Sequence, residues 1–274
     1  MPLVAMTREM GSMGMDVARI VESELRVPLV YHEIIDHLAD KMRLRKSHVV
    51  RLLGGKASLL ERLTSDKTSL SIFTADEVLQ TASKGAVLRG WGAAHLLRPV
   101  KHAVCVRVCA PRELRVGRMM ERLDTDDREA VETEIKHSDE AQGAIVRRHF
   151  GVDWQHPELY DLSLNTERMS VEQCAERVIG LARDPRFAET EASRAQLEDL
   201  VQIAKVRAAL RADPATRELS VPIRARDGAV TLEGVVDSAE QAKLAGRVAA
   251  GAPGVRSVEN LLRAAEEVGR TVRE

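Results

Sequence analysis

The sequence predicts an α/β protein in which a doubly wound parallel sheet precedes a small α+β domain. Short apolar runs bounded by turn residues, such as 86–89 and 103–108, alternate with helical segments up to about residue 183, as buried parallel strands and their crossover helices do. A polar, proline-containing segment at 184–194 ends this pattern. Beyond it, two short strands flank Asp227-Gly228, a dipeptide that favours a tight hairpin.

The first domain is expected to alternate strands and helices. An apolar strand at 3–6 leads into a glycine loop and a helix that ends near Leu25. The expected elements that follow are a strand at 27–31, a helix at 33–43, a helix with a mobile loop within 44–75, a helix from Asp76 to Lys84, strands at 86–89 and 103–108, a helix from Pro111, a helix at 128–149 and a strand at 160–164. Ser170 and Gln173 have the spacing of a capping box, which predicts where the next helix begins.

The second domain is expected to have the order α-β-β-α-β. An apolar stripe from Leu197 to Ala208 indicates its first helix, and AVTLEGVV and VRSVENLL indicate strands. Gly234 shares the inward phase of Val230 and Leu232, which predicts that a helix approaches the sheet closely there. A length of 274 residues also favours more than one domain. We expect domains at 1–183 and 195–265, a linker at 184–194 and a tail at 266–274.

Composition excludes several classes of protein. Lys plus Arg number 41 against 42 for Asp plus Glu, and aromatic residues make up 3%, so the sequence lacks the basic, aromatic character of a dedicated nucleic-acid binder. No apolar run is long enough to span a bilayer and no signal segment opens the sequence, so we expect a cytoplasmic protein. Cys105, Cys109 and Cys174 do not have the number or spacing of a zinc site or a disulfide framework; we expect buried free thiols.

The segment 4–25 predicts a phosphate-binding loop. A strand, a loop with Gly11 and Gly14 and a helix follow one another, and glycines allow backbone N–H groups to crowd around an anion at the positive end of a helix. The usual phosphate loop continues with a lysine for the outer phosphates and a hydroxyl for magnesium. Here Met15 and Asp16 follow Gly14, so the cradle is predicted without its cation.

Longer stretches carry two family resemblances. Residues 1–183 resemble the cytidylate kinase-like family of P-loop proteins through TREMGSMGMDVA, VLRGWGAAHLL, HAVCVRVCAPRELRVGRM and RRHFGVDWQHPELYDLSLNTERMSVE. Residues 200–263 resemble a BON domain through DGAVTLEGVVDSAEQAKLA and PGVRSVENLL. The first resemblance implies a P-loop kinase fold and phosphoryl transfer from ATP, with Mg²⁺, to a nucleoside monophosphate. The second implies a phospholipid surface or a protein as partner.

The chain departs from the kinase pattern where cations are expected. Met15 replaces the lysine of the general loop, Trp91 replaces the arginine of the family's G-R-G, and Gln142 stands where an arginine usually follows Asp139 by three residues. The lid turn at 123–127 is acidic. Each missing charge-assisted contact costs on the order of a hundredfold in rate.

The candidate site residues combine the loop with arginines that substitute for these losses. The expected cofactor-binding residues are Arg8, Gly11, Ser12, Met13, Gly14, Met15, Asp16 and Arg19. The catalytic candidates are Asp139, which fits the lid helix of the family, and Arg118, Arg122 and Arg147 as cations that could substitute for the missing ones. Arg148 is a further such cation. Arg89, Trp91 and Asn165 are the substrate-binding candidates.

Four of these residues keep alternative interpretations. Arg19 either reaches over the loop, because helical side chains lean toward the N-terminus, or is a solvated surface arginine. Asp16 either favours the positive end of the helix or holds the metal ion. Trp91 either stacks on a base or fills the core, and Asn165 either contacts a base or forms a turn.

Two functions follow as hypotheses. The first is a nucleotide-binding phosphotransferase with a BON domain for localisation or regulation. The alternative is a catalytically degenerate nucleotide sensor or scaffold whose BON domain binds a protein or a lipid. The second domain has no basic stretch, so we expect at most weak lipid binding.

Overall fold

The computed structural model describes residues 1–30, 32–42, 44–53, 66–90 and 92–265. Contacts divide the chain into two compact units. The first unit comprises residues 1–66 and 84–190, and the second comprises 67–83 and 191–274. Each unit is described by itself.

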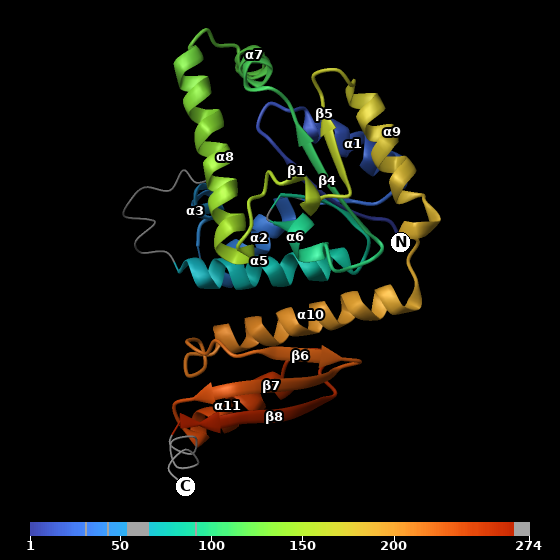
Figure 1. Ribbon diagram of the computed structural model, residues 1–274. Helices are drawn as coiled ribbons and strands as arrows, with labels where there is room; N and C mark the ends of the chain where they lie inside the picture. The colour runs from blue at the N-terminus through green and yellow to red at the C-terminus, as the bar shows by residue number, and fades with distance from the viewer. Residues whose placement is uncertain (31, 43, 54–65, 91, 266–274) are drawn as a thin grey trace. The chain divides into compact units, whose positions relative to one another are not determined.

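The first unit is built on a parallel sheet of five strands in the order β2-β3-β1-β4-β5 (Figure 1). The strands are β1 (Leu3–Arg8), β2 (Leu29–Val30), β3 (Ala86–Arg89), β4 (Ala103–Cys109) and β5 (Leu162–Asn165). Every neighbouring pair is parallel. The doubly wound parallel sheet that the sequence predicts is therefore confirmed.

Helices cover both faces of this sheet. The even-numbered residues of β1, Val4 and Met6, pack with residues of α1 (Gly14–Leu25) and α9 (Val171–Ala182) in one core. On the other face, α6 (Ala93–Leu97) contacts β1 and β4. The other described helices of this unit are α2 (His32–Met42), α3 (Lys46–Leu53), α7 (Arg112–Leu123), α8 (Arg128–Phe150), η1 (Pro157–Leu159) and η2 (Pro185–Phe187). The capping box of Ser170 and Gln173 is present at the start of α9.

The segment 67–83 corrects the predicted helix from Asp76 to Lys84. Helix α5 spans Lys67–Ala82, and Asp76 lies in its interior with 3% of its surface exposed. The Ser/Thr-rich residues before Asp76 tolerate a helix because a hydroxyl can bond within it: Thr74 donates to the carbonyl of Leu70 at 2.6 Å. Asp76 therefore does not begin the helix, and its carboxylate accepts from Gln80 at 2.7 Å. The predicted mobile loop overlaps residues 54–65, which lie outside the described residues.

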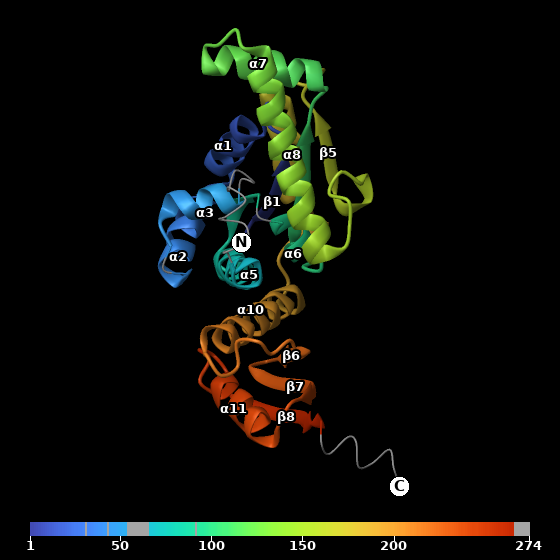
Figure 2. The ribbon, with the colours of Figure 1, turned by 90° about the vertical axis from the view of Figure 1, so that its left-hand side faces the viewer.

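The second unit contains the expected α-β-β-α-β fold. Its elements are α10 (Glu191–Ala212), β6 (Ile223–Arg226), β7 (Ala229–Val236), α11 (Ala239–Ala250) and β8 (Ser257–Ala264). Strand β7 is central, antiparallel to β6 and parallel to β8, and α11 runs alongside β7 and β8 (Figure 2). Asp227 and Gly228 both have positive φ, 51° and 78°, as the favoured hairpin turn requires.

The close approach of a helix to this sheet occurs at Gly246 rather than at Gly234. A Cβ atom on Gly234 would meet Val221 and Pro222 at ordinary van der Waals distances, and its φ of +127° is what favours glycine there. A Cβ atom on Gly246 would lie 2.7 Å from the side-chain nitrogen of Asn260. That nitrogen donates to the carbonyl of Ala242 at 2.7 Å, so Gly246 makes room for a side chain that fastens α11 to β8.

Candidate functional site

The candidate site is the loop at residues 9–13, between β1 and α1. It follows the carboxyl end of the central strand, beside the point where the strand order reverses, which is where open α/β sheets bind ligands. Ser12 donates its amide to the carbonyl of Glu9 at 3.1 Å. Its hydroxyl donates to the carbonyls of Glu9 and Val108 at 2.7 and 3.1 Å. Ser12 is fully buried, so its donors fix the shape of the loop and are not available to a ligand.

The backbone amides next to Ser12 differ from its own amide in their hydrogen bonding. Among the described residues, the N–H groups of Gly11, Met13, Gly14 and Met15 have no hydrogen-bond acceptor. Buried or partly buried amides without an acceptor are rare in proteins, and several of them at the positive end of a helix attract an anion. The loop therefore has the donors of a phosphate cradle, supplied by the residues around Ser12.

The two glycines have packing roles as well. A Cβ atom on Gly11, whose φ is +79°, would lie 2.7 Å from the carbonyl oxygen of Arg115 on α7. A Cβ atom on Gly14 would lie 2.6 Å from the Cβ atom of Arg8. Both positions exclude a side chain because the loop lies close to α7 and to the end of β1. The glycines thus bring the loop against its neighbours, which places the unpartnered amides.

A hydrogen-bond relay fastens an arginine to the loop. Thr166, at the end of β5, donates its hydroxyl to the carbonyl of Ser12 at 3.0 Å. Arg118 of α7 donates to the hydroxyl and to the carbonyl of Thr166 at 2.8 and 2.7 Å. Thr166 is 3% exposed and Arg118 is half-buried. These two bonds use only part of the donor capacity of a guanidinium. Arg118 is therefore held beside the loop and keeps N–H donors that a ligand could accept from.

A buried ion network supports the other side of the loop. Glu9, 5% exposed, accepts from Arg107 at 2.5 Å and from the amide of Ala110 at 3.2 Å. Arg115 lies 3.5 Å from Glu9 and donates to Asp139 of α8 at 2.8 Å. Arg115 also donates to the carbonyl of Met10 at 3.3 Å. The network therefore joins the loop, β4, α7 and α8. Its positive and negative side chains form ion pairs with one another.

The sequence matches two family models. Residues 3–168, more than half of the chain, match the cytidylate kinase-like family. The chain belongs to the cytidylate kinase-like family. Residues 198–266 match the BON domain, so the fusion expected from the sequence is confirmed.

Solved structures give the fold a second line of comparison. An uncharacterized protein from Eubacterium ventriosum ATCC 27560 is 17% identical, with a TM-score of 0.52 over 66% of this chain and 98% of that one; this likeness shows the fold alone. Shikimate kinases from Acinetobacter baumannii, solved with shikimate, and from Bacteroides thetaiotaomicron are 13% and 12% identical, with TM-scores of 0.40 and 0.41. They cover 66% of this chain, and 92% and 97% of their own. None of the curated proteins searched matches the sequence.

Asp139 and Asp16 each lie near an arginine side chain. Asp139, a predicted catalytic residue, accepts from Arg115 of α7 at 2.8 Å, while Gln142 adds no positive charge. Asp16 lies 3.9 Å from Arg19, whose side chain is 64% exposed. Among the described residues, no three His, Cys, Asp or Glu side chains gather as metal ligands.

The other described site residues lie on β1, β3, α7, α8 and β5. Arg8 is half-buried and Arg89 is buried, and both have interaction partners. Arg122, Arg147 and Arg148 are exposed and form no ion pair among the described residues. Asn165 forms a turn, because its side chain accepts from the amide of Glu167 at 2.9 Å. Trp91 lies outside the described residues, so neither of its interpretations is tested.

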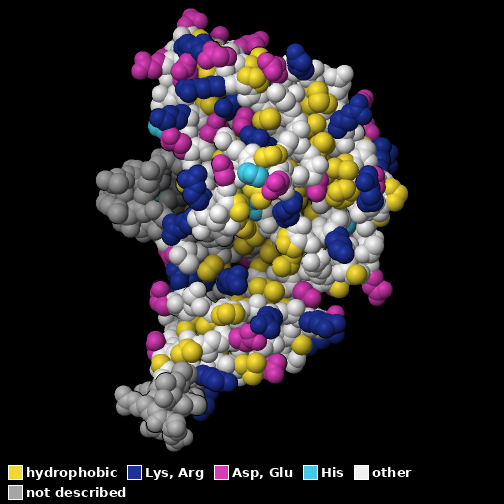
Figure 3. Space-filling view, in the orientation of Figure 1, with side chains coloured by type: hydrophobic (Ala, Val, Ile, Leu, Met, Phe, Trp, Pro, Cys, Tyr) yellow, Lys and Arg dark blue, Asp and Glu magenta, His cyan; other side chains and the backbone are white. Residues whose placement is uncertain are grey.

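The lid turn between α7 and α8 is acidic, as expected. On the face shown in Figure 3, acidic side chains gather where these two helices meet, and Asp124, Asp126 and Asp127 are exposed. Asp127 caps α8 by accepting from the amide of Ala130 at 3.0 Å. The acidic residue that begins α8 thus has a local structural role.

The face of the sheet under α6 carries neutral buried groups. Burial, with a smaller contribution from the charge of Arg98, lowers the pKa of His95, whose ring lies 5.3 Å from that of Phe150. Burial also raises the pKa of Cys105 to about 12, and the thiol donates to the carbonyl of Ala94 at 3.2 Å. The Tyr160 hydroxyl, whose pKa burial raises to about 12, donates to the carbonyl of Trp154. These groups pack the core and supply no charge.

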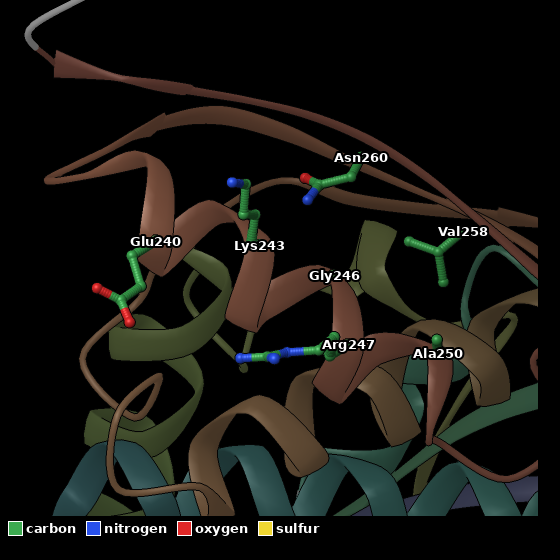
Figure 4. Close-up of a pocket in the computed structure, with 7 residues that line it drawn as sticks. All are labelled: Glu240, Lys243, Gly246, Arg247, Ala250, Val258 and Asn260. Carbon is green, nitrogen blue, oxygen red and sulfur yellow. The ribbon is translucent and has the colours of Figure 1, made fainter.

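The BON-like region has a groove of its own, between α11 and β8 (Figure 4). Its volume is about 880 Å³, and Lys243, Arg247 and Asn260 line it. Lys243 extends from α11 toward β8 and Asn260 extends from β8 toward α11, whereas Arg247 extends along α11. Neither Lys243 nor Arg247 has an ion-pair partner among the described residues. No described helix is long and apolar enough to cross a membrane.

The ion network is what the sequence-based analysis missed. Its members come from four separate segments, and no spacing relates them. One signal was present: Arg107 interrupts the otherwise apolar run AVCVRVC, and a charge on a strand that is buried on both faces requires a buried partner. The same rule points to Glu9, which directly follows a buried strand.

Proposed function

We propose that the cytidylate kinase-like unit binds ATP at the loop and transfers its terminal phosphoryl group to a nucleoside monophosphate. The observation that carries this proposal is the set of amides at Gly11, Met13, Gly14 and Met15 that have no acceptor in the described part of the chain, beside an arginine fixed to the same loop. Phosphoryl transfer depends mainly on positioning and on positive charge around the phosphates. Membership of the family supports the same reaction class.

The residues present fit a nucleotide phosphate. The amides of the loop would hold the phosphate oxygens, and Arg118 would supply the fixed positive charge that the methionine at position 15 does not. Mg²⁺, where bound, neutralises phosphate charge; Asp16, half-buried at the first turn of α1, is the residue that would hold it. Arg19 would then exchange its distant contact with Asp16 for the phosphates.

Calorimetry and a turnover assay test this proposal together. The full chain is titrated with ATP in the presence and absence of Mg²⁺, and then assayed with a panel of nucleoside monophosphates. Arg118→Met is expected to weaken ATP binding by about 10- to 100-fold, the loss of one charge-assisted contact. Arg112→Met is the matched control on the same helix, because Arg112 is 55% exposed and its ion-pair partner among the described residues is Glu132, at 3.3 Å.

The alternative is a nucleotide sensor without catalytic activity. It is supported by charges that pair within the protein and not with a ligand: Asp139 and Arg115 neutralise each other, and Gln142 adds no cation. ATP binding without turnover on any acceptor would favour the sensor over the enzyme. Absence of binding by ATP, GTP and all monophosphates would exclude both.

For the BON-like region, we propose localisation or regulation through a protein or lipid partner. Lys243 and Arg247, without ion-pair partners in the described part of the chain, favour an anionic group on that partner. Pelleting with anionic vesicles, comparing the full chain with the double variant Lys243→Gln and Arg247→Gln, tests the lipid. Equal pelleting of the two proteins would show that Lys243 and Arg247 do not bind anionic lipid.

A further inference from the structure

Helix α10 has two apolar faces. The first, called the outer face below, consists of the buried residues Leu197, Val201, Ala204 and Ala208. Their spacings of four and three residues place them along one side of a helix. Val206 and Leu210 instead belong to the core that contains Leu232 of β7. At about 100° per residue, Val206 points away from the outer face, so the outer face is turned away from the sheet of the BON-like fold.

Helix α5 covers the outer face. The two helices pack against each other within the second unit, and they run side by side in Figure 1. Arg211, three residues beyond Ala208 and on the same side of α10, donates its Nε to the hydroxyl of Ser69 on α5 at 2.7 Å. Ser69, Leu70 and Phe73 are buried in turn. The outer face is therefore a helix-docking surface whose occupant comes from a distant part of the same chain.

In the sequence, α5 lies between two segments of the first unit. Residues 1–66 precede α5 and residues 84–190 follow it, and both segments belong to the first unit. Only residues 83–85 connect the end of α5 to β3, and Ser83 is tied to α5 through the carbonyls of Leu79 and Gln80. Strand β3 pairs with β1 and β2 and ends at Arg89, directly before Gly90.

The geometry points to α5 as an integral helix of the BON-like unit, docked on the outer face of α10 although the sequence encodes it within the kinase-like region. The BON model, which begins at residue 198, does not include this helix. Whatever stabilises the second unit then also stabilises α5, by linkage, and α5 is joined to β3 by a short connection. This inference does not rest on the proposed nucleotide site.

Hydrogen exchange on the full chain tests the assignment by destabilising one unit at a time. Leu232→Ala removes a fully buried side chain from the core of the second unit, and Val106→Ala does the same in β4 of the first. We expect Leu232→Ala to accelerate exchange of the α5 amides at least tenfold, together with those of β7. Val106→Ala should accelerate β1 and β4 and leave α5 within about twofold of the wild type. The inference would be overturned if Val106→Ala accelerated exchange of the α5 amides together with those of β1 and β4. It would also be overturned if Leu232→Ala left exchange of the α5 amides unchanged.

A second pair of variants tests the docking surface itself. Val201→Asp places a carboxylate on the outer face, and Gln196→Asp places one at an exposed position of the same helix. We expect Val201→Asp, but not Gln196→Asp, to accelerate exchange of α5 at least tenfold while β1 and β4 remain protected. If Val201→Asp also deprotects β7 and β8, α5 has still unfolded with the second unit, as the inference requires. Unchanged protection of α5 in Val201→Asp would contradict it.

Discussion

The two sides of the loop at residues 9–13 are held by different kinds of interaction. On one side, Glu9, Arg107, Arg115 and Asp139 form a buried network in which charges of both signs satisfy one another. On the other side, a neutral hydroxyl, that of Thr166, links the carbonyl of Ser12 to Arg118. The first side leaves no charge for a ligand, whereas the second fixes a cation that retains donors. Changes to the ion network should therefore act on stability, and changes to the relay should act on binding.

The largest effect is expected for Arg115→Met. Glu9 and Asp139 would keep their buried charges and lose a shared partner, and breaking a buried ion pair in this way costs about 3–5 kcal/mol in the free energy of unfolding. Urea denaturation without nucleotide measures the loss. Arg112→Met is the control, because exposed pairs contribute about 1 kcal/mol or less. Equal losses for Arg112→Met and Arg115→Met would show that the network is no stronger than a surface ion pair.

A neutral buried group gives a reference for the charged network. The thiol of Cys105 has an ordinary pKa of 9.0 and a pKa of about 12 in the folded protein. Between these values the unfolded chain loses the proton that the folded chain keeps, so the free energy of unfolding should fall as pH rises, by up to about 4 kcal/mol.

Cys105→Val should lack this component, so the stability of the wild type relative to the variant should decline across the same pH range. Denaturant titrations of both proteins under reducing conditions measure the difference. Tyr160, whose pKa is also raised to about 12, is common to both and cancels in the comparison. A difference that does not depend on pH would mean that the thiol is accessible to solvent.

The relay side is tested by Thr166→Val, which keeps the shape of the side chain and removes its hydroxyl. The buried carbonyl of Ser12 would lose its donor, at a cost of about 1–3 kcal/mol, and Arg118 would keep only the carbonyl of Thr166. We expect weaker ATP binding, measured by calorimetry, and less than additive losses when Thr166→Val is combined with Arg118→Met. Fully additive losses would show that Thr166 does not position Arg118.

The contrast between the two sides also explains what could be predicted from the sequence. The sheet, the loop and the hairpin at Asp227-Gly228 follow from local patterns, because buried strands are continuously apolar and tight turns require particular residues. The network could not be predicted, because Glu9 and Asp139 are far apart in sequence and meet only when α8 folds over α7. Helix α5 begins earlier than local patterns predict for a similar reason: its Ser/Thr-rich start is helical only because packing outweighs local propensity.

The smallest effect, and the most direct test of the missing cation, is expected for Met15→Lys. The ammonium group would stand where the general phosphate-loop pattern has its lysine, beside amides for which the described residues supply no acceptor. We expect ATP to bind about tenfold more tightly, a gain of about 1.4 kcal/mol for one added charge-assisted contact. Met15→Gln, of similar length and uncharged, should give no such gain, and the gain of the lysine should shrink as salt is added. If the two variants bind ATP equally, the phosphates do not lie at the start of α1, and Arg118 is fixed beside the loop for a reason other than nucleotide binding.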